Sequence, residues 1–216
     1  MKFIQLSYNL NKNTPSYGGR HKVSIEPFEQ IKNGSTANSY MVNFYNHIGT
    51  HIDAPNHFFE SGKKIIDYNI NELFFKKPQI IDVSLLEKNE ISLETIVGEC
   101  DIESDIILFR TFFSKYRNSE KYINSYPVFS SEFAKYLKDK CKKLRAIGFD
   151  TISLTSPLNK EEGKKAHQLF LNGETPTLII EDMNLEHYSS NIKKILVVPF
   201  NFEKIDSAPC GVYGII

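Results

Sequence analysis

The chain has 216 residues, 41% of them hydrophobic, which is enough to enclose one sizeable core, and we expect a single domain over residues 1–216. Its 26 Lys and Arg residues balance its 26 Asp and Glu residues. The protein therefore has no net charge with which to attract nucleic acid or an anionic membrane, and we expect neither as a partner.

The first ten residues contain no unbroken apolar run, so we expect neither a signal peptide nor a membrane span there. The three cysteines, Cys100, Cys141 and Cys210, are odd in number and far apart in the sequence, and they lack the close pairs that mark a structural zinc site or a disulfide framework. This pattern indicates a reducing compartment, and we expect a cytoplasmic protein.

Residues 46–59 hold three histidines and an aspartate within eleven positions, in the pattern H-x-x-x-H-x-D-x-x-x-H. The four residues are His47, His51, Asp53 and His57. A helix is disfavoured here because Gly49 and several β-branched residues oppose it. In an extended segment His51 and Asp53 project to the same side, and a turn at Gly49 can return His47 toward them.

This combination of imidazoles and a carboxylate is typical of sites for Zn²⁺ or Mn²⁺, and a shared carboxylate can bridge two ions. We therefore predict a divalent metal cofactor, with Zn²⁺ as the first choice and Mn²⁺ as the alternative. One or two ions are both compatible with the pattern. The competing interpretation is that the histidines are only packed core residues.

Five short apolar runs rich in β-branched residues predict buried strands. They are residues 80–83, 106–109, 146–149, 178–180 and 195–200. Apolar residues at helical spacing predict a helix that reaches from Phe133 to Leu144, with Ser130 and Ser131 as candidate N-caps. A second helix is predicted over residues 161–171, because Gly173 follows as a stop. Together these elements indicate an α/β protein.

Residues 112–126 are polar yet carry five aromatic side chains, which predicts a long loop. Loops of this length are uncommon without a function. A lid, a subunit contact and ordinary surface packing are all compatible with this composition.

Two further residues can complete the metal site. His167 lies on or beside the apolar face of the second predicted helix, where a packed core histidine is the competing interpretation. Glu181 follows the fourth predicted strand, and a buried carboxylate is costly unless it is paired, as it would be by a metal. Asp182 should point the other way. His21 and His187 have no acidic or histidine neighbours in the sequence, and we expect both on the surface.

The segment 47–58 resembles the metal-binding signature of the cyclase family that includes bacterial kynurenine formamidase and isatin hydrolase. Other segments resemble landmarks of that family in the same order. They are Leu6-Ser7, residues 14–17, Arg110-Thr111, residues 147–151, His167, Glu181 and residues 207–211. The resemblance spans almost the whole chain.

The resemblance implies a β-rich mixed α/β single domain of the swivelling β/β/α-like type. It also implies two sets of metal ligands. These are His47, His51 and Asp53 for a first ion, and Asp53, Glu181 and His167 for a second. His57 would then be the proton donor and acceptor, since a histidine titrates in the range where a metal-activated water does.

The resemblance further implies a homodimer, which the loop at residues 112–126 could assist, and a small-molecule amide or lactam substrate on an aromatic body. The expected activity is that of a metal-dependent amidohydrolase acting on C–N bonds other than peptide bonds. Tyr17 stands where formamidases place a tryptophan against the substrate ring, and residues 151–156 differ from the usual family run. Formylkynurenine, an isatin-like lactam and another small amide therefore all remain candidates. The alternative outside the enzyme class is a non-catalytic metal-binding protein of the same fold.

Overall fold

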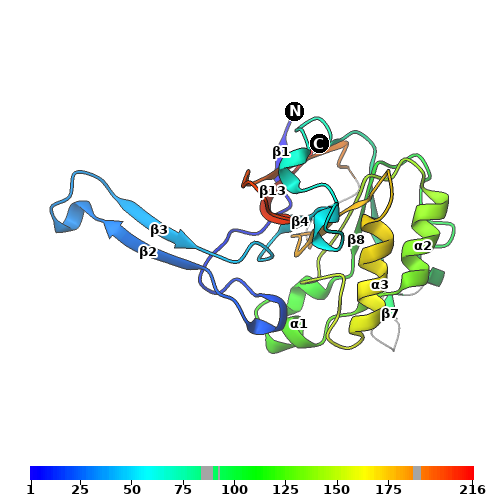
Figure 1. The fold of residues 1–216 in the computed structure, drawn as a ribbon, viewed down its shortest axis with the longest axis horizontal. Helices are drawn as coiled ribbons and strands as arrows, with labels where there is room; N and C mark the ends of the chain where they lie inside the picture. Colours follow the sequence, from blue (N-terminus) through cyan, green and yellow to red (C-terminus); the bar gives the residue numbers. More distant parts are fainter. Residues whose placement is uncertain (84–89, 92, 187–190) are drawn as a thin grey trace.

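A mixed sheet of nine strands forms the centre of the molecule in the computed structural model, which describes residues 1–83, 90–91, 93–186 and 191–216 (Figure 1). Eight strands follow one another across it. They are β5 (Phe74–Phe75), β12 (Lys194–Pro199), β13 (Ser207–Ile215), β4 (His51–Asp53), β11 (Leu178–Glu181), β10 (Ala146–Phe149), β8 (Ile106–Arg110) and β6 (Pro78–Asp82). The ninth, β1 (Phe3–Gln5), pairs with β13.

The sheet is parallel on one side and antiparallel on the other. β6, β8, β10 and β11 run parallel, whereas β4 is antiparallel to both of its neighbours, β11 and β13. The predicted run at 146–149 coincides with β10, and the other four predicted runs correspond to β6, β8, β11 and β12 with ends shifted by at most two residues. The expected mixed α/β fold class is confirmed.

Each face of the sheet packs into its own hydrophobic cluster, because successive residues of a strand point to opposite sides. In β8, Ile107 and Phe109 pack with the helical layer, whereas Ile106 and Leu108 join the cluster on the opposite face. The helical layer consists of α2 (Ser131–Lys140) and α3 (Lys160–Leu171), which lie side by side (Figure 1). Strands buried on both faces explain the unbroken apolar runs in the sequence.

The helix α2 begins as predicted, since the Ser130 side chain accepts a hydrogen bond from the Phe133 amide at 3.1 Å. It ends at Lys140, however, so Cys141 and Leu144 lie beyond it although both are buried. The physical reason is the short connection to β10, in which the chain must leave the helix and turn back into the sheet.

Short elements complete the described part of the fold. They are α1 (Glu120–Asn124), β7 (Glu90–Ile91), β9 (Val128–Phe129), and 3-10 helices at Tyr17–Gly19, Ile31–Asn33, Pro55–His57, Ile65–Asp67, Leu93–Thr95 and Phe113–Tyr116. Among the residues described, no helix is long and apolar enough to cross a membrane.

The aromatic segment 112–126, predicted as a long loop, instead contains the 3-10 helix Phe113–Tyr116 and α1, and it is packed onto its own chain. Phe113, Tyr122 and Tyr126 are buried, and the Arg117 guanidinium pairs with Asp182 at 2.6 Å. The Tyr122 hydroxyl donates to the same Asp182 carboxylate at 2.6 Å. Asp182 therefore points away from the predicted ligands, and the segment packs against the body through three of its five aromatic rings.

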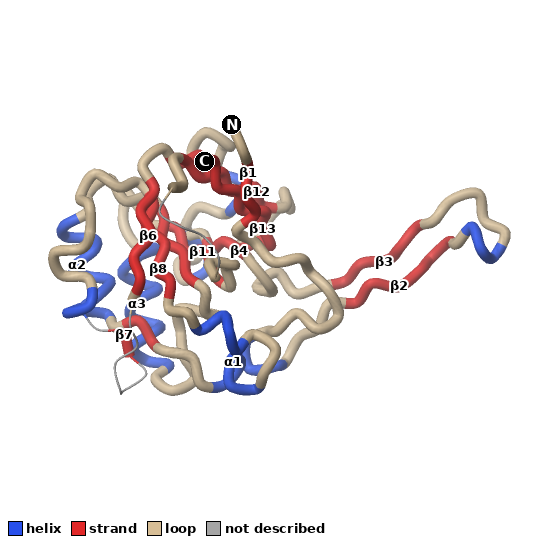
Figure 2. The backbone as a smooth tube through the Cα atoms, turned by 180° about the vertical axis from the view of Figure 1, so that it is seen from behind, coloured by secondary structure: helices blue, strands red, loops and turns tan. Residues whose placement is uncertain are grey.

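A hairpin formed by β2 (Ser24–Glu29) and β3 (Ser39–Asn43) projects away from the body, and we call it the arm (Figures 1 and 2). Neither strand pairs with the main sheet. Cross-strand partners share a face of a hairpin. The pairs Ile25–Val42 and Pro27–Tyr40 thus form an apolar face of the arm.

Candidate metal centre and active site

Two central strands position the core of the site. In β4, His51 and Asp53 alternate with Ile52, so their side chains share one face of the sheet. Glu181, at the end of β11, lies opposite His51 in the antiparallel register. Its carboxylate Oε2 is 3.3 Å from His51 Nε2. All three ionisable side chains are buried, so their geometry is fixed by the sheet.

The turn before β4 brings in His47, as the sequence predicted. Gly49 has a φ of 64°, and a Cβ atom there would collide with the Leu10 side chain, so the turn requires glycine. The turn places His47 Nδ1 3.1 Å from Asp53 Oδ1.

The helix α3 contributes His167 from the other side. His167 Nε2 lies 3.4 Å from Glu181 Oε1. The opposite ring nitrogen, Nδ1, is hydrogen-bonded to the Gly163 carbonyl at 2.9 Å and lies 3.0 Å from the Thr155 hydroxyl. A bond from Nδ1–H to that carbonyl leaves Nε2 directed at Glu181.

The resulting donor set fits divalent metal. Two groups each have potential ligand atoms within 4.8 Å of one another: His47, Asp53 and His57, and His51, Asp53 and Glu181. His51 Nδ1 is held by the Gly49 carbonyl at 2.8 Å, which leaves Nε2 available to a metal. That Nε2 and both Asp53 carboxylate oxygens are buried without a well-aligned hydrogen bond. Buried polar atoms rarely lack a partner, so a cation is the natural one.

A third carboxylate, which the sequence did not point out, stands behind two of the histidines. Asp206 Oδ2 is 2.8 Å from His47 Nε2 and 2.7 Å from His57 Nδ1. Asp206 directly precedes the family-like landmark at residues 207–211, and that proximity is the one signal that could have identified it. Its histidine partners lie far earlier in the chain, at sequence separations of 159 residues for His47 and 149 residues for His57.

The charges of the site stabilise one another in the absence of metal. Burial lowers the pKa of His47, but Asp53 and Asp206 outweigh it and raise that pKa to about 11. Burial raises the pKa of Glu181, but the adjacent imidazoles of His167 and His51 bring it down to about 2. Burial likewise opposes ionisation of Asp206, and its two histidine partners hold that pKa well below its usual range. All of these carboxylates are therefore ionised at neutral pH.

The ligand groups open into one pocket, whose wall also contains the rings of Tyr17, Tyr45 and Phe58. Its lining residues are Tyr17, Arg20, His21, Tyr45, His47, His51, Asp53, His57, Phe58, Ile152, Ser153, Thr155, His167 and Glu181. All six predicted metal and proton-transfer residues thus face the same cavity, together with Tyr17. His21 is exposed, as expected, but it stacks on Tyr45 at 4.1 Å between ring centroids and borders the pocket. His187 lies outside the described residues.

The sequence of the chain is similar to those of known hydrolases. The Cyclase family model matches residues 4–156 of the chain. This chain belongs to the Cyclase family. It is 29% identical to a kynurenine formamidase of Bacillus cereus and 30% identical to one of Bacillus cytotoxicus. Each alignment covers 96% of this chain and 94% of the relative. The resemblance drawn from the sequence motifs is confirmed, and the chain is a hydrolase of this family.

Solved structures share the fold. Isatin hydrolase A from Labrenzia aggregata, bound to benzyl benzoate, superposes with a TM-score of 0.82 at 16% identity, over 100% of this chain and 93% of the other. A "predicted metal-dependent hydrolase" from Bacillus stearothermophilus superposes with a TM-score of 0.79 at 20% identity, over 99% and 97%.

Proposed function

We propose that this Cyclase-family member is a metal-dependent hydrolase of a small amide borne on an aromatic body, with residues 1–216 acting as one domain. The observation that carries the proposal is the position of His57. Its ring lies 4.3 Å from that of His47, between centroids, yet it is held by Asp206 and not by the deeper carboxylates. A purely structural metal site needs no such additional histidine.

The site residues divide into metal ligands and one residue that transfers protons. We assign His47 Nδ1, His51 Nε2 and Asp53 to a first divalent ion. Glu181 and His167 Nε2, with Asp53 shared, would hold a second. When bound, such ions act as Lewis acids that activate water near neutral pH and polarise a carbonyl. Zn²⁺ is our first choice because nitrogen and carboxylate ligands in a compact set suit it, and Mn²⁺ is the alternative.

The proton step is assigned to His57. Its side chain is 28% exposed, which gives it access to substrate in the pocket, whereas His51 and His167 are buried. With Nδ1 donating to Asp206, Nε2 remains for exchange with the substrate. We propose that Nε2 accepts a proton from the attacking water and returns it to the departing nitrogen, so that no serine or cysteine nucleophile is required.

The substrate we propose first is N-formylkynurenine or a similar aryl formamide. Tyr17, Tyr45 and Phe58 give the pocket aromatic walls on which a ring can stack. Curated relatives at about the same length are kynurenine formamidases, which supports this choice. An isatin-type lactam is the second candidate, supported by the structural likeness to isatin hydrolase A.

Metal analysis of the native protein, combined with hydrolysis assays on formylkynurenine, isatin and formanilide, tests this proposal. We expect bound divalent metal and fastest turnover of a formyl-aryl amide. The His57→Ala variant should retain its metal and lose about 10²- to 10⁴-fold in kcat. Full activity of that variant would refute its role. Bound metal without turnover of any amide would instead favour the non-catalytic alternative.

We also propose that the protein works as a homodimer and that the arm forms part of the contact. Isolated two-stranded hairpins are marginal in water, so the arm needs a partner surface. Its apolar face is open, with Val42 48% and Tyr40 54% exposed. The rings of segment 112–126, which could also assist pairing, are mostly buried in their own chain, so the arm is the better candidate.

Light scattering tests this second proposal. The native protein should have twice the 24.9 kDa mass of one chain at micromolar concentration. Val42→Glu should give a monomer, because it places a charge on the apolar face. Glu26→Lys, on the opposite face of the same hairpin, is the matched control and should remain dimeric. A monomeric native protein would refute the proposal.

The compartment we propose is the cytoplasm. Cys100, Cys141 and Cys210 are all free, and unpaired thiols of this kind are typical of a reducing environment. An assay of cell fractions for the protein would test this assignment.

A further inference from the structure

Asp206 has an unusually complete set of hydrogen-bond partners for a side chain that is 25% exposed. Its Oδ2 contacts one nitrogen of His47 and one of His57, while its Oδ1 accepts from Asn46 Nδ2 at 2.9 Å. The backbone is fixed as well, since the Asp206 carbonyl accepts from the Ala54 amide at 2.9 Å. The carboxylate is thus held against the segment that carries the candidate ligands.

These contacts determine the tautomers of two histidines. An ionised carboxylate only accepts hydrogen bonds, so each ring nitrogen that faces Asp206 must carry the hydrogen. The proton of His47 that a metal can displace is then the one on Nδ1, which lies on the Asp53 side. His57 keeps its Nε2 lone pair, which forms no hydrogen bond among the residues that the structure describes. Asp206 Oδ2 therefore orients both His47, a candidate metal ligand, and His57, the candidate proton acceptor.

We propose that Asp206 is a positioning residue that couples the metal centre to the proton-transfer histidine, an inference that rests on the function proposed above. It acts on the metal through His47 and on turnover through His57, without touching the reacting atoms. Carboxylates behind metal-bound histidines commonly fix ring orientation and ligand basicity. Here the same carboxylate also supports a second histidine, so its loss should disturb two measurable properties together.

A neutral amide cannot replace this carboxylate. The side chain of Asp206→Asn has one oxygen and one NH₂ group, so it cannot accept from Asn46 on one side and from two imidazoles on the other. In either orientation of the amide, its NH₂ group faces another hydrogen-bond donor, either Asn46 Nδ2 or the two imidazole N–H groups. Asp206→Glu keeps the charge but moves it by one methylene and should be affected less.

The competing explanation is that Asp206 only ties the loop before β13 to residues 46–57. A tether of that kind contributes to stability, but it leaves the histidine tautomers and the metal affinity unchanged once the protein is folded. The two explanations can therefore be separated by measurements other than activity.

The first measurement is metal affinity, by competition of the metal-free protein with a chromophoric chelator for Zn²⁺. We expect Asp206→Asn to bind Zn²⁺ about 10- to 100-fold more weakly. Asp67→Asn is the matched control, because Asp67 is an exposed carboxylate in the following segment that accepts from the Lys64 amide. That variant should bind Zn²⁺ as the native protein does.

The second measurement is the tautomer of His57, by NMR of Zn²⁺-loaded protein with ¹⁵N-labelled histidine. In the native protein, the hydrogen of His57 should lie on Nδ1, and the hydrogen of His47 should lie on Nε2. In Asp206→Asn the His57 signals should shift toward a mixture of tautomers. A tether would leave these signals unchanged.

The third measurement is a double-mutant cycle on kcat at saturating Zn²⁺. Asp206→Asn should lower kcat about 10- to 100-fold in the native background. In a His57→Ala background the same substitution should have little further effect, because the residue through which it acts is gone. Additive losses would contradict action through His57.

Native Zn²⁺ affinity, native tautomers and native kcat in Asp206→Asn would together overturn the proposal. If that variant does not fold, Asn46→Ala replaces it. This change removes the hydrogen bond to Asp206 Oδ1 together with a longer one, 3.3 Å, to the Ser207 carbonyl, and it should weaken Zn²⁺ binding in the same direction. Native affinity would overturn the proposal equally. If the native protein hydrolyses no amide, the proposed function fails, but the affinity and NMR results still decide the role of Asp206.

Discussion

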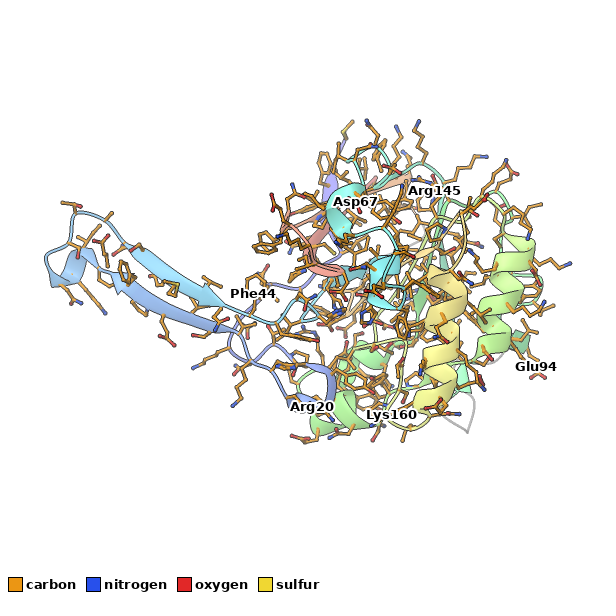
Figure 3. The ribbon with its side chains drawn as sticks, viewed as in Figure 1. Arg20, Phe44, Asp67, Glu94, Arg145 and Lys160 are labelled. Carbon is orange, nitrogen blue, oxygen red and sulfur yellow. The ribbon has the colours of Figure 1, made fainter. Side chains whose placement is uncertain are left out.

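The site segment 46–57 and the arm are separated along the chain by only Phe44 and Tyr45. The site segment nevertheless lies inside the body, whereas the arm projects away from it (Figure 3). In the site segment, β4 lies between two strands of the main sheet and all three of its residues are buried. In the arm, each strand has one neighbour, and β3 is exposed at four of its five residues.

This contrast shows how the chain divides its tasks. Ligand geometry needs side chains held in one arrangement, which neighbouring strands on both sides provide. The junction is itself fixed, because Tyr45 stacks on His21 while Phe44 packs near Phe200 at 6.1 Å between ring centroids. The arm beyond this junction leaves apolar side chains free for another surface. Changes in one region should therefore leave the other intact.

The largest effect is expected from Asp53→Asn, because both candidate ligand groups share this carboxylate. Metal ions supply several kcal/mol of transition-state stabilisation, so kcat/KM should fall by about a thousandfold or more. Steady-state assays and metal analysis of the same samples would measure the loss. Asp139→Asn, an exposed carboxylate paired with Lys135, is the control and should behave as native. A metal-loaded, active Asp53→Asn protein would contradict the shared-ligand geometry.

A second prediction concerns the pH dependence of the metal-free protein. Since the folded pKa of His47 is raised to about 11 from 6.5, its bound proton stabilises the fold fully below pH 6.5. That stabilisation is lost as the pH rises toward 11, by at most about 1.4 kcal/mol per pH unit. Urea unfolding of chelated protein between pH 6.5 and 8.5 should show the decline.

The His47→Gln variant is the control for this slope and should show a flatter dependence. Zn²⁺ affinity should have the opposite trend and rise with pH, because binding must displace the same proton. Equal slopes in the native and variant proteins would contradict the assignment to His47.

Sequence patterns anticipated much of this arrangement, for physical reasons. Buried central strands such as β10 need apolar residues on both faces, so they appear as continuous apolar runs. The six predicted site residues also meet in one pocket, because four come from a single short segment and Glu181 lies opposite His51 in the sheet. Their individual roles stay predictions.

Other features left no local pattern. The strand β13 contains Pro209, Gly211 and Gly214, residues that normally argue against a strand interior. The arm has Pro27 within β2 and a register shift after it, which obscures the alternation of a hairpin. Asp206 acts through partners distant in the chain, so only the assembled structure brings it to His57.

Removal of the arm should have a smaller effect than either change above. Ser24 and Asn43 are cross-strand partners, so a short glycine linker can join them in place of residues 25–42. Because this segment contributes nothing to the main sheet, thermal unfolding and Zn²⁺ affinity of the body should change little, whereas the dimer should be lost. A shortened protein that cannot bind Zn²⁺ would show that the two regions depend on each other.

The smallest effect is expected at Tyr17, which lines the pocket and is half-buried. Burial and then the Glu181 charge raise the pKa of Tyr17, so its hydroxyl stays protonated and the ring can stack on an aromatic substrate. Stacking contributes about 0.5–1.5 kcal/mol, so Tyr17→Ala should raise KM for formylkynurenine about two- to tenfold with kcat nearly unchanged. Tyr17→Trp should lower that KM, and Tyr17→Phe should match the native value. A fall in kcat without a change in KM would place Tyr17 in the proton transfer and not in the stacking wall.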